Sequence, residues 1–276
     1  MKRMSAPALM ILSSFFLSLM SILVKASGSR LPSMEIVFFR SAIITLITFS
    51  MALKLKLPIW GRNVKLLIIR GLFGFVGLSA FFYTLTHIPI ADSVTLLYTS
   101  PLFTAMIAPS MLKEKNTGKN WFYFLLAFIG LMLIVRPGFS LQFLPALVGV
   151  GGALFAGLAY NTVRKLRETE HEITVVYYFS FISTLLSSPS LLTDYVKPRF
   201  VEWLMLAGVG IFAFLAQWLM TQALHRDRAA KVMNMSYIGV VFSTILGIIF
   251  FMEIPDWRTI VGATIVIFSI INIARS

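Results

Sequence analysis

Long runs of apolar residues follow one another along almost the whole chain, and charged residues are largely confined to the short stretches between them. Each run has roughly the 17 to 25 residues needed to cross the hydrocarbon core of a bilayer, where only helices satisfy the backbone of such single segments. The runs therefore predict ten membrane-spanning helices, at residues 7–27, 34–53, 64–86, 91–112, 120–136, 144–163, 173–193, 202–224, 230–251 and 257–274. The separators carry helix breakers such as Pro58 and Gly138.

The composition is that of an integral membrane protein. Hydrophobic residues make up 58% of the 276 residues and charged residues only 13%, which is about half of the charged fraction of soluble domains; the mean hydropathy is +0.87. The net charge of +13 does not indicate nucleic-acid binding, because that needs a basic face on a soluble module. Residues 1–26 resemble a signal peptide, but the apolar run is long for one and more hydrophobic segments follow, so we expect a retained first helix.

The distribution of Lys and Arg predicts the orientation, because cytoplasmic loops retain these residues. With the amino terminus inside, sixteen Lys and Arg lie in the inner segments and six in the outer ones. We therefore expect both termini in the cytoplasm. The chain has no Cys, which excludes disulfides, thiolate nucleophiles and Cys metal sites.

Residues 71–114 recur 139 positions later as residues 210–253. In both copies a ladder of small residues precedes a polar break, an apolar run with one Tyr and a terminal Glu. Five helices is an odd number, so the second copy must enter the bilayer upside down, and the Lys and Arg bias of corresponding loops does exchange. We predict two inverted five-helix repeats, 1–138 and 139–276, which is the plan of many secondary transporters with a site at the repeat interface.

Two stretches resemble a known family. Residues 70–115, RGLFGFVGLSAFFYTLTHIPIADSVTLLYTSPLFTAMIAPSMLKEK, and residues 24–40, VKASGSRLPSMEIVFFR, are similar to the EamA branch of the drug/metabolite transporter superfamily, and the resemblance extends over nearly the whole chain. It implies a carrier of the bacterial inner membrane that works by alternating access. It also implies a central cavity lined by the first, third, fourth, sixth, eighth and ninth helices.

Polar side chains are costly inside a bilayer, so they are candidates for function. In the segment 91–112, Thr95 and Tyr98 share one face, and the repeat offset places Asn234 and Tyr237 at the equivalent positions of the segment 230–251. We predict that these four side chains line a substrate site. The alternative is that they only cap packing contacts between helices.

Seven further polar or aromatic side chains are predicted to line the same site. They are Gln217, Trp218, Thr221 and Gln222 in the segment 202–224, Tyr83 in the segment 64–86, and Tyr160 and Asn161 in the segment 144–163. Hydrogen bonding between helices is the alternative for the glutamines. For Tyr160 and Asn161 the alternative is a place at the membrane interface, where Tyr is common.

Charged residues and one proline are candidates for gating or charge pairing. Arg40 lies about six residues into its span, where pairing with Glu35 or snorkelling is favoured over binding an anionic substrate group. Arg70 is interpreted as an anchor at the membrane interface. Glu114 ends its helix at a surface, which favours pairing in a gate or loop. Pro101 interrupts a helix, as either a moving kink or a fixed bend.

The residues present favour a carrier over an enzyme or a channel. The three His lie in or beside loops, and neither HExxH nor GxSxG occurs. The sequence shows no ring of charged residues of the kind that would indicate a channel. We expect no cofactor, no metal and no nucleic acid. A small organic metabolite is the expected substrate, such as an amino acid or a related zwitterionic or neutral compound. The alternative is uptake of a nucleotide-like or vitamin cofactor, such as S-adenosylmethionine or riboflavin, which relatives carry.

Two properties of the carrier remain open at this stage. No Asp or Glu lies in the middle third of any predicted helix, so exchange or facilitated diffusion is at least as well supported as proton coupling. Beyond the substrate and the lipid bilayer we expect no partner, and therefore a monomer, with a dimer as the alternative.

Overall fold

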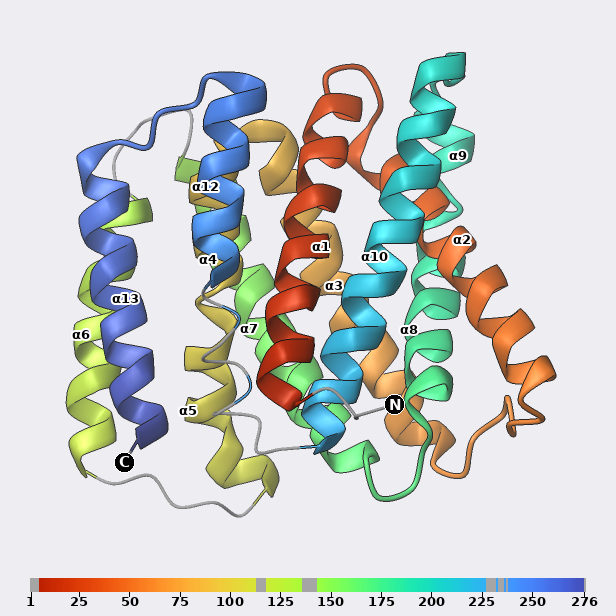
Figure 1. Cartoon of the computed structure of the whole chain (residues 1–276), viewed down its shortest axis with the longest axis horizontal. Helices are drawn as coiled ribbons and strands as arrows, with labels where there is room; N and C mark the ends of the chain where they lie inside the picture. Colours follow the sequence, from red (N-terminus) through yellow and green to blue (C-terminus); the bar gives the residue numbers. More distant parts are fainter. Residues whose placement is uncertain are drawn as a thin grey trace.

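The computed structural model describes residues 5–112, 118–135, 143–226, 232, 236 and 238–275, and all regular structure in these ranges is helical. The helices stand side by side as a bundle (Figure 1). They are α1 (Ala6–Ser27), α2 (Ser33–Lys54), α3 (Val64–His87), α4 (Ile90–Leu97), α5 (Ser100–Leu112), α6 (Gly118–Val135), α7 (Phe143–Leu166), α8 (Glu172–Ser187), α9 (Ser190–Thr193), α10 (Phe200–Arg226), α12 (Ile238–Phe251) and α13 (Trp257–Arg275). The described residues confirm the predicted all-helical fold class.

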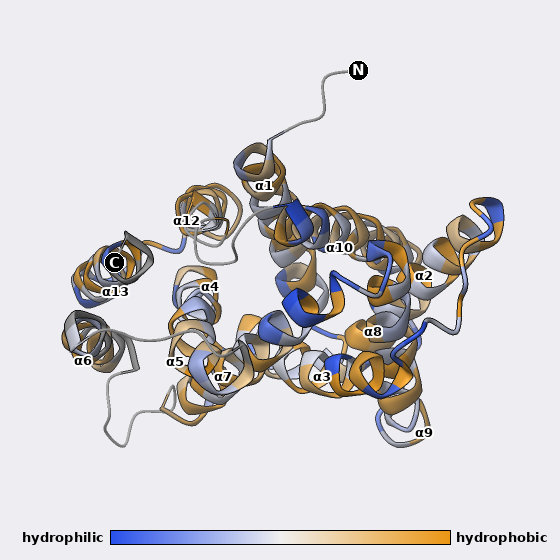
Figure 2. Cartoon of the chain, turned by 90° about the horizontal axis from the view of Figure 1, so that it is seen from below, coloured by the Kyte–Doolittle hydropathy of each residue, from blue (hydrophilic) through white to orange (hydrophobic). Residues whose placement is uncertain are grey.

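Seven stretches of the described chain are long and apolar enough to cross a membrane. They are Ala6–Ser27, Ser33–Lys54, Val64–His87, Ile90–Met111, Phe143–Leu166, Glu172–Thr193 and Phe200–Arg226. Shorter apolar helical stretches lie in α6, α12 and α13. Hydrophobic colour runs along most of the helices, whereas hydrophilic colour is concentrated at connections and helix ends (Figure 2). This distribution fits a bundle surrounded by lipid.

The span predicted at residues 91–112 is two helices. The chain turns at Tyr98 and Thr99 between α4 and α5. Pro101 lies in the first turn of α5, where a missing backbone N–H leaves no helical hydrogen bond unmade. The interruption therefore falls before Pro101, and it places Tyr98 at the C-terminal cap of α4.

Small residues let the central helices approach one another closely. α1 packs on α10 and α12, and α3 packs on α7 and α8. A Cβ atom at Gly77 of α3 would lie 3.1 Å from the backbone oxygen of Gly152 in α7. Likewise, a Cβ atom at Gly157 would lie 2.9 Å from the backbone nitrogen of Thr104 in α5. The predicted small-residue ladders are thus packing surfaces, as expected from membrane helices.

Serines of α1 connect that helix to its neighbours. The Ser13 hydroxyl donates to the carbonyl of Ala216 in α10 at 2.7 Å. The hydroxyls of Ser18 and Ser243, in α1 and α12, lie 2.9 Å apart. Such bonds satisfy polar groups that would otherwise be exposed to hydrocarbon, so α1 is held centrally between α10 and α12.

Candidate functional site

A cavity of about 820 Å³, counted with its open mouth, lies inside the bundle. Most of its wall consists of small or apolar side chains of α1, α3, α7 and α10. Its larger polar groups are few and come from different helices: Arg40, Arg70, Tyr98, Tyr160 and Gln217. An apolar hollow with a few converging polar groups is the usual form of a small-molecule site.

The cavity lies around the middle of the helices that line it. Its lining residues run from Met10 to Met20 on α1, from Ala156 to Tyr160 on α7 and from Ala213 to Met220 on α10. On α3 they run from Arg70 to Phe81.

Arg40 of α2 and Arg70 of α3 both reach the cavity and lie beside the same aromatic ring. Their side chains are buried, with residue exposures of 3% and 2%. Their guanidinium carbons lie 5.1 and 4.4 Å from the ring centroid of Phe179 in α8. In both arginines Nε and Nη1 are buried and have no hydrogen-bond partner within the described chain. The site therefore contains two positively charged groups whose Nε and Nη1 donors have no hydrogen-bond partner among the described residues.

Because α4 ends at Leu97, Tyr98 lies at the turn between α4 and α5 and lines the cavity. Its side chain is buried and lies against Gly239 of α12, where a Cβ atom would collide with the phenol oxygen. The hydroxyl interacts with Ser14 of α1. On α7, Tyr160 lies close to Arg70 and interacts with Ser100 of α5.

Gln217 of α10 adds a donor to the same wall. Its Nε2 atom is buried and has no hydrogen-bond partner among the described residues. Because a buried amide donor without a partner is costly, this atom is available to a bound molecule or to water.

The sequence matches the profile of the EamA-like transporter family over residues 4–136 and again over residues 143–275. The chain belongs to this family. Its named relatives are membrane transporters rather than enzymes.

Three relatives show how widely the cargoes of this family differ. The pseudopaline exporter of Pseudomonas aeruginosa strain UCBPP-PA14 is 34% identical, over 99% of this chain and 96% of that protein. The riboflavin transporter of Vibrio cholerae is 27% identical, over 89% and 84%. The S-adenosylmethionine uptake transporter of Rickettsia bellii is 26% identical, over 92% and 89%. One crystal structure with 18% sequence identity superposes with a TM-score of 0.70 over 97% of this chain and 96% of that one, which shows a shared fold.

In this EamA-like transporter, four of the residues predicted from sequence reach the cavity: Tyr98, Tyr160, Gln217 and Arg40. The predicted pairing of Arg40 with Glu35 is not found in the structure. One carboxylate oxygen of Glu35 accepts from the backbone nitrogen of Val196 at 3.0 Å, and the other has no partner among the described residues. Snorkelling is not found either, because Arg40 is buried.

Several predicted side chains are satisfied by their own helix and do not line the cavity. The hydroxyls of Thr95 and Thr221 donate to the carbonyls of Ala91 and Gln217, at 2.6 and 2.8 Å. Gln222 accepts from Arg226 at 3.2 Å.

Other predicted side chains contact different neighbours outside the cavity. Tyr83 stacks on His87 with ring centroids 4.0 Å apart, and Trp218 stacks on Phe214 at 5.7 Å. The Asn161 amide donates to the carbonyl of Thr104 at 3.0 Å. The remaining predicted residues, Asn234, Tyr237 and Glu114, lie outside the described residues.

The prediction for Arg70 is wrong: it lies in the cavity rather than at the membrane interface. The sequence contains one indication of this inward position, a glycine (Gly74) one helical turn after Arg70. A Cβ atom there would collide with Nη1 of Arg70 and would lie 2.7 Å from the Phe179 ring. The glycine provides the space in which the guanidinium lies.

Ion pairs tie helices together at the end of the transporter opposite to the start of α1. Lys25, near the end of α1, pairs with Glu253, just after α12, and donates to the carbonyl of Ile88 at 3.0 Å. Glu253 also accepts from the backbone nitrogen of Ile90 at 2.9 Å. The pair thus joins α1, α12 and the connection between α3 and α4.

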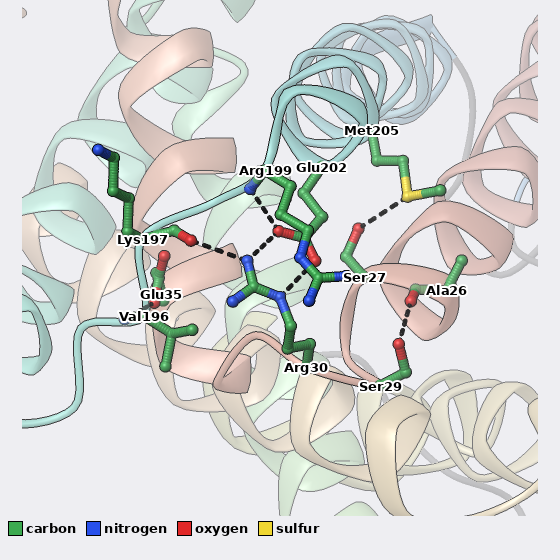
Figure 3. Close-up of polar contacts among 10 residues, drawn as sticks. All are labelled: Ala26, Ser27, Ser29, Arg30, Glu35, Val196, Lys197, Arg199, Glu202 and Met205. Atoms are coloured by element: carbon green, nitrogen blue, oxygen red, sulfur yellow. Dashed lines mark hydrogen bonds and ion pairs between the residues drawn. The ribbon is translucent and has the colours of Figure 1, made fainter.

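A second ion pair lies at the same end, between the α1–α2 connection and α10 (Figure 3). Arg30 pairs with Glu202 through two nitrogens and donates to the carbonyl of Lys197 at 2.8 Å. Glu202 accepts in addition from the backbone nitrogen of Arg199 at 2.6 Å. The hydrogen bonds that Arg30 donates to the Glu202 carboxylate raise the pKa of Arg30 above its ordinary value, so Arg30 stays charged at any working pH.

Proposed function

We propose that this chain is a secondary transporter that carries a small organic metabolite across a bacterial inner membrane by alternating access. The observation that carries the proposal is the internal cavity with converging polar groups in a member of a transporter family. A secondary transporter binds its solute near the middle of the bilayer and exposes that site to one side at a time. No carboxylate lines the described cavity wall, so exchange and facilitated diffusion stand beside proton coupling. The carrier acts as a monomer, because one chain supplies the cavity.

Two inverted repeats of five helices each, ten in all, are part of the proposal. Two helix contacts are related by the repeat offset of 139 residues. Gly71 of α3 lies against Ile182 of α8, and the equivalent residues Gly210 of α10 and Ile43 of α2 also lie against each other. Equivalent residues also meet, as expected on a two-fold axis. The hydroxyls of Thr45 and Thr184, 139 positions apart, lie 3.4 Å from each other. α1 and α7 run in opposite directions (Figure 1).

The proposed orientation places both termini in the cytoplasm and the cavity near the middle of the bilayer. The pairs Lys25–Glu253 and Arg30–Glu202 then lie on the outer side. This arrangement corresponds to a conformation that is closed outward. Opening outward requires the helices joined by these pairs to separate.

The cavity wall supports the proposed class of solute, which no single relative determines. Tyr98, Tyr160 and Gln217 beside apolar walls suit an organic molecule with polar and apolar parts, such as an amino acid or a related metabolite. Uptake of a nucleotide-like or vitamin cofactor is the second candidate, favoured by the riboflavin and S-adenosylmethionine transporters among the relatives. The pseudopaline exporter leaves export equally open.

Transport is tested by solute flux into proteoliposomes that contain the purified protein. We expect uptake that saturates and that is accelerated by unlabelled solute on the opposite side. Uptake proportional to concentration without such acceleration would indicate a channel, and an altered product would indicate an enzyme.

The inverted arrangement has its own test, because the chain lacks Cys and single cysteines can be introduced directly. Trp60 lies between α2 and α3 and Tyr195 between α9 and α10, and both are exposed. These connections correspond under the repeat offset. An impermeant maleimide should label Trp60→Cys and Tyr195→Cys from opposite sides of the membrane; labelling from one side would refute the inversion.

A further inference from the structure

We propose that Arg40 and Arg70 form a binding site for the carboxylate groups of an organic anion, so that the carried solute is anionic. This inference rests on the proposed function, and it replaces the neutral or zwitterionic cargo expected from the sequence. It starts from the burial of two like charges. Both guanidinium carbons lie within 5.1 Å of the centroid of one ring, that of Phe179. They are therefore within about 10 Å of each other and repel in a low-dielectric interior.

No carboxylate of the described chain offsets these charges. The cavity wall contains no Asp or Glu among its described residues. Five acidic side chains contact groups at helix ends or in loops: Glu35 at Val196, Asp92 at Thr259, Glu170 at Arg62 and Asn63, Glu202 at Arg30, and Glu253 at Lys25. Glu168, Glu172 and Asp194 contact their chain neighbours Arg167, His171 and Thr193. A buried cation without a partner is strongly unfavourable, so an anion supplied from outside would relieve the cost.

The two arginines are held in place rather than left free. Each cation lies beside the ring of Phe179, which attracts it. Gly74 leaves the space that Nη1 of Arg70 occupies. The Nε and Nη1 atoms of both arginines have no partner within the described chain, and the planar guanidinium matches a carboxylate with two parallel N–H groups.

The remaining polar wall fits the same chemistry. Nε2 of Gln217 is a further donor without a partner among the described residues, and the phenol of Tyr160 lies near Arg70. Donors therefore predominate over acceptors around the two cations. The small and apolar residues of α1, α7 and α10 leave room for a carbon skeleton. We assign the solute as an organic molecule with one or two carboxylates.

Binding is tested by thermal shift of the purified full-length protein with glutarate, citrate and glutamate, each beside its carboxamide counterpart, and with inorganic phosphate. A ligand that binds the folded state raises its melting temperature. We expect at least one carboxylate to stabilise the wild type and its amide not to do so. Arg40→Gln and Arg70→Gln should weaken that binding at least tenfold. Arg258→Gln, which removes an exposed charge on α13, should bind like the wild type.

The melting temperature without ligand separates binding from a structural role. Arg40 and Arg70 donate no hydrogen bond from Nε or Nη1 in the described chain, so the Gln variants should melt no lower than the wild type. A clear loss of stability in both variants would mean that the arginines hold the fold. Equal binding by both variants and wild type, equal shifts by carboxylate and amide, or no shift with any carboxylate would overturn the proposal.

Flux measurements distinguish this inference from the proposed function. Saturable, trans-stimulated uptake of a neutral amide in preference to its carboxylate overturns the anion site and leaves the transporter intact. Carboxylate binding that depends on Arg40 and Arg70 without any flux supports the anion site and removes the transport function. Stronger stabilisation by inorganic phosphate than by every carboxylate overturns the assignment of the solute as a carboxylate.

Discussion

Replacing Glu253 by Gln is expected to expose the cavity to the side of the membrane that the ion pairs close. The Glu253 carboxylate holds two elements at once: it pairs with Lys25 at the end of α1 and accepts the backbone N–H of Ile90 at the start of α4. Gln keeps the shape and one acceptor oxygen but removes the charge. The closed conformation therefore loses stabilisation that an outwardly open conformation does not have.

The size of the effect follows from the burial of the pair. The side chains of Lys25 and Glu253 are 18% and 21% exposed. Their attraction lies between that of exposed pairs, about 0–1 kcal/mol, and the cost of breaking a buried pair, about 3–5 kcal/mol. A loss of about 1–2 kcal/mol changes a two-state ratio roughly 5- to 30-fold. The open population should rise by that factor.

The assay is labelling of a cysteine at Met20, which lines the cavity and is buried. The rate of reaction with an impermeant maleimide added on the Lys25 side reports the open population. Glu253→Gln should raise this rate roughly 5- to 30-fold, and adding Lys25→Gln should raise it little further, because the two residues act as one pair. Asp194→Asn is the matched control, since its side chain contacts the adjacent Thr193. An unchanged rate in Glu253→Gln, or the same increase in Asp194→Asn, would refute the reasoning.

Further predictions concern packing, a loop anchor and the cavity wall. Gly77→Leu should lower stability by about 1–3 kcal/mol because a side chain there meets the backbone of α7, whereas Gly151→Leu, which projects into open space, should not; thermal melting compares them. Glu170→Ala should lower the melting temperature by removing the acceptor of two backbone N–H groups, at about 1–3 kcal/mol for each, whereas Glu168→Ala at an exposed site should leave it unchanged. Gln217→Leu should weaken solute binding roughly tenfold without lowering the melting temperature of the ligand-free protein, and titration of the thermal shift would reveal a failure.

The helices are predictable because membrane crossing requires a minimum length and an apolar composition, and both can be read directly from the sequence. The predicted segment 64–86 differs from α3 (Val64–His87) by a single residue. The sequence predicts a break at Pro101 within 91–112, but proline is tolerated in the first turn of a helix. The chain therefore turns at Tyr98 and Thr99 instead, which no local composition indicates.

The site is less predictable because depth and direction depend on neighbouring helices. Arg70 lies near the start of an apolar run, where snorkelling is the common outcome, and only its packing on Phe179 shows that it points inward. Thr95 carries a hydroxyl in a span, but the carbonyl of Ala91 satisfies it locally. Tyr98 and Gln217 are predictable because each shares a helix face with another polar residue.

The contact between α3 and α7 has a mechanical consequence. At Gly77 and Gly152 the two helices meet with almost no interlocking side chains, so a small axial shift requires no rotamer change at that point. Resistance to such sliding arises elsewhere along the same interface, where the rings of Phe73 in α3 and Phe155 in α7 pack with centroids 6.0 Å apart. The glycine contact permits small axial shifts between α3 and α7, and the aromatic contact limits them.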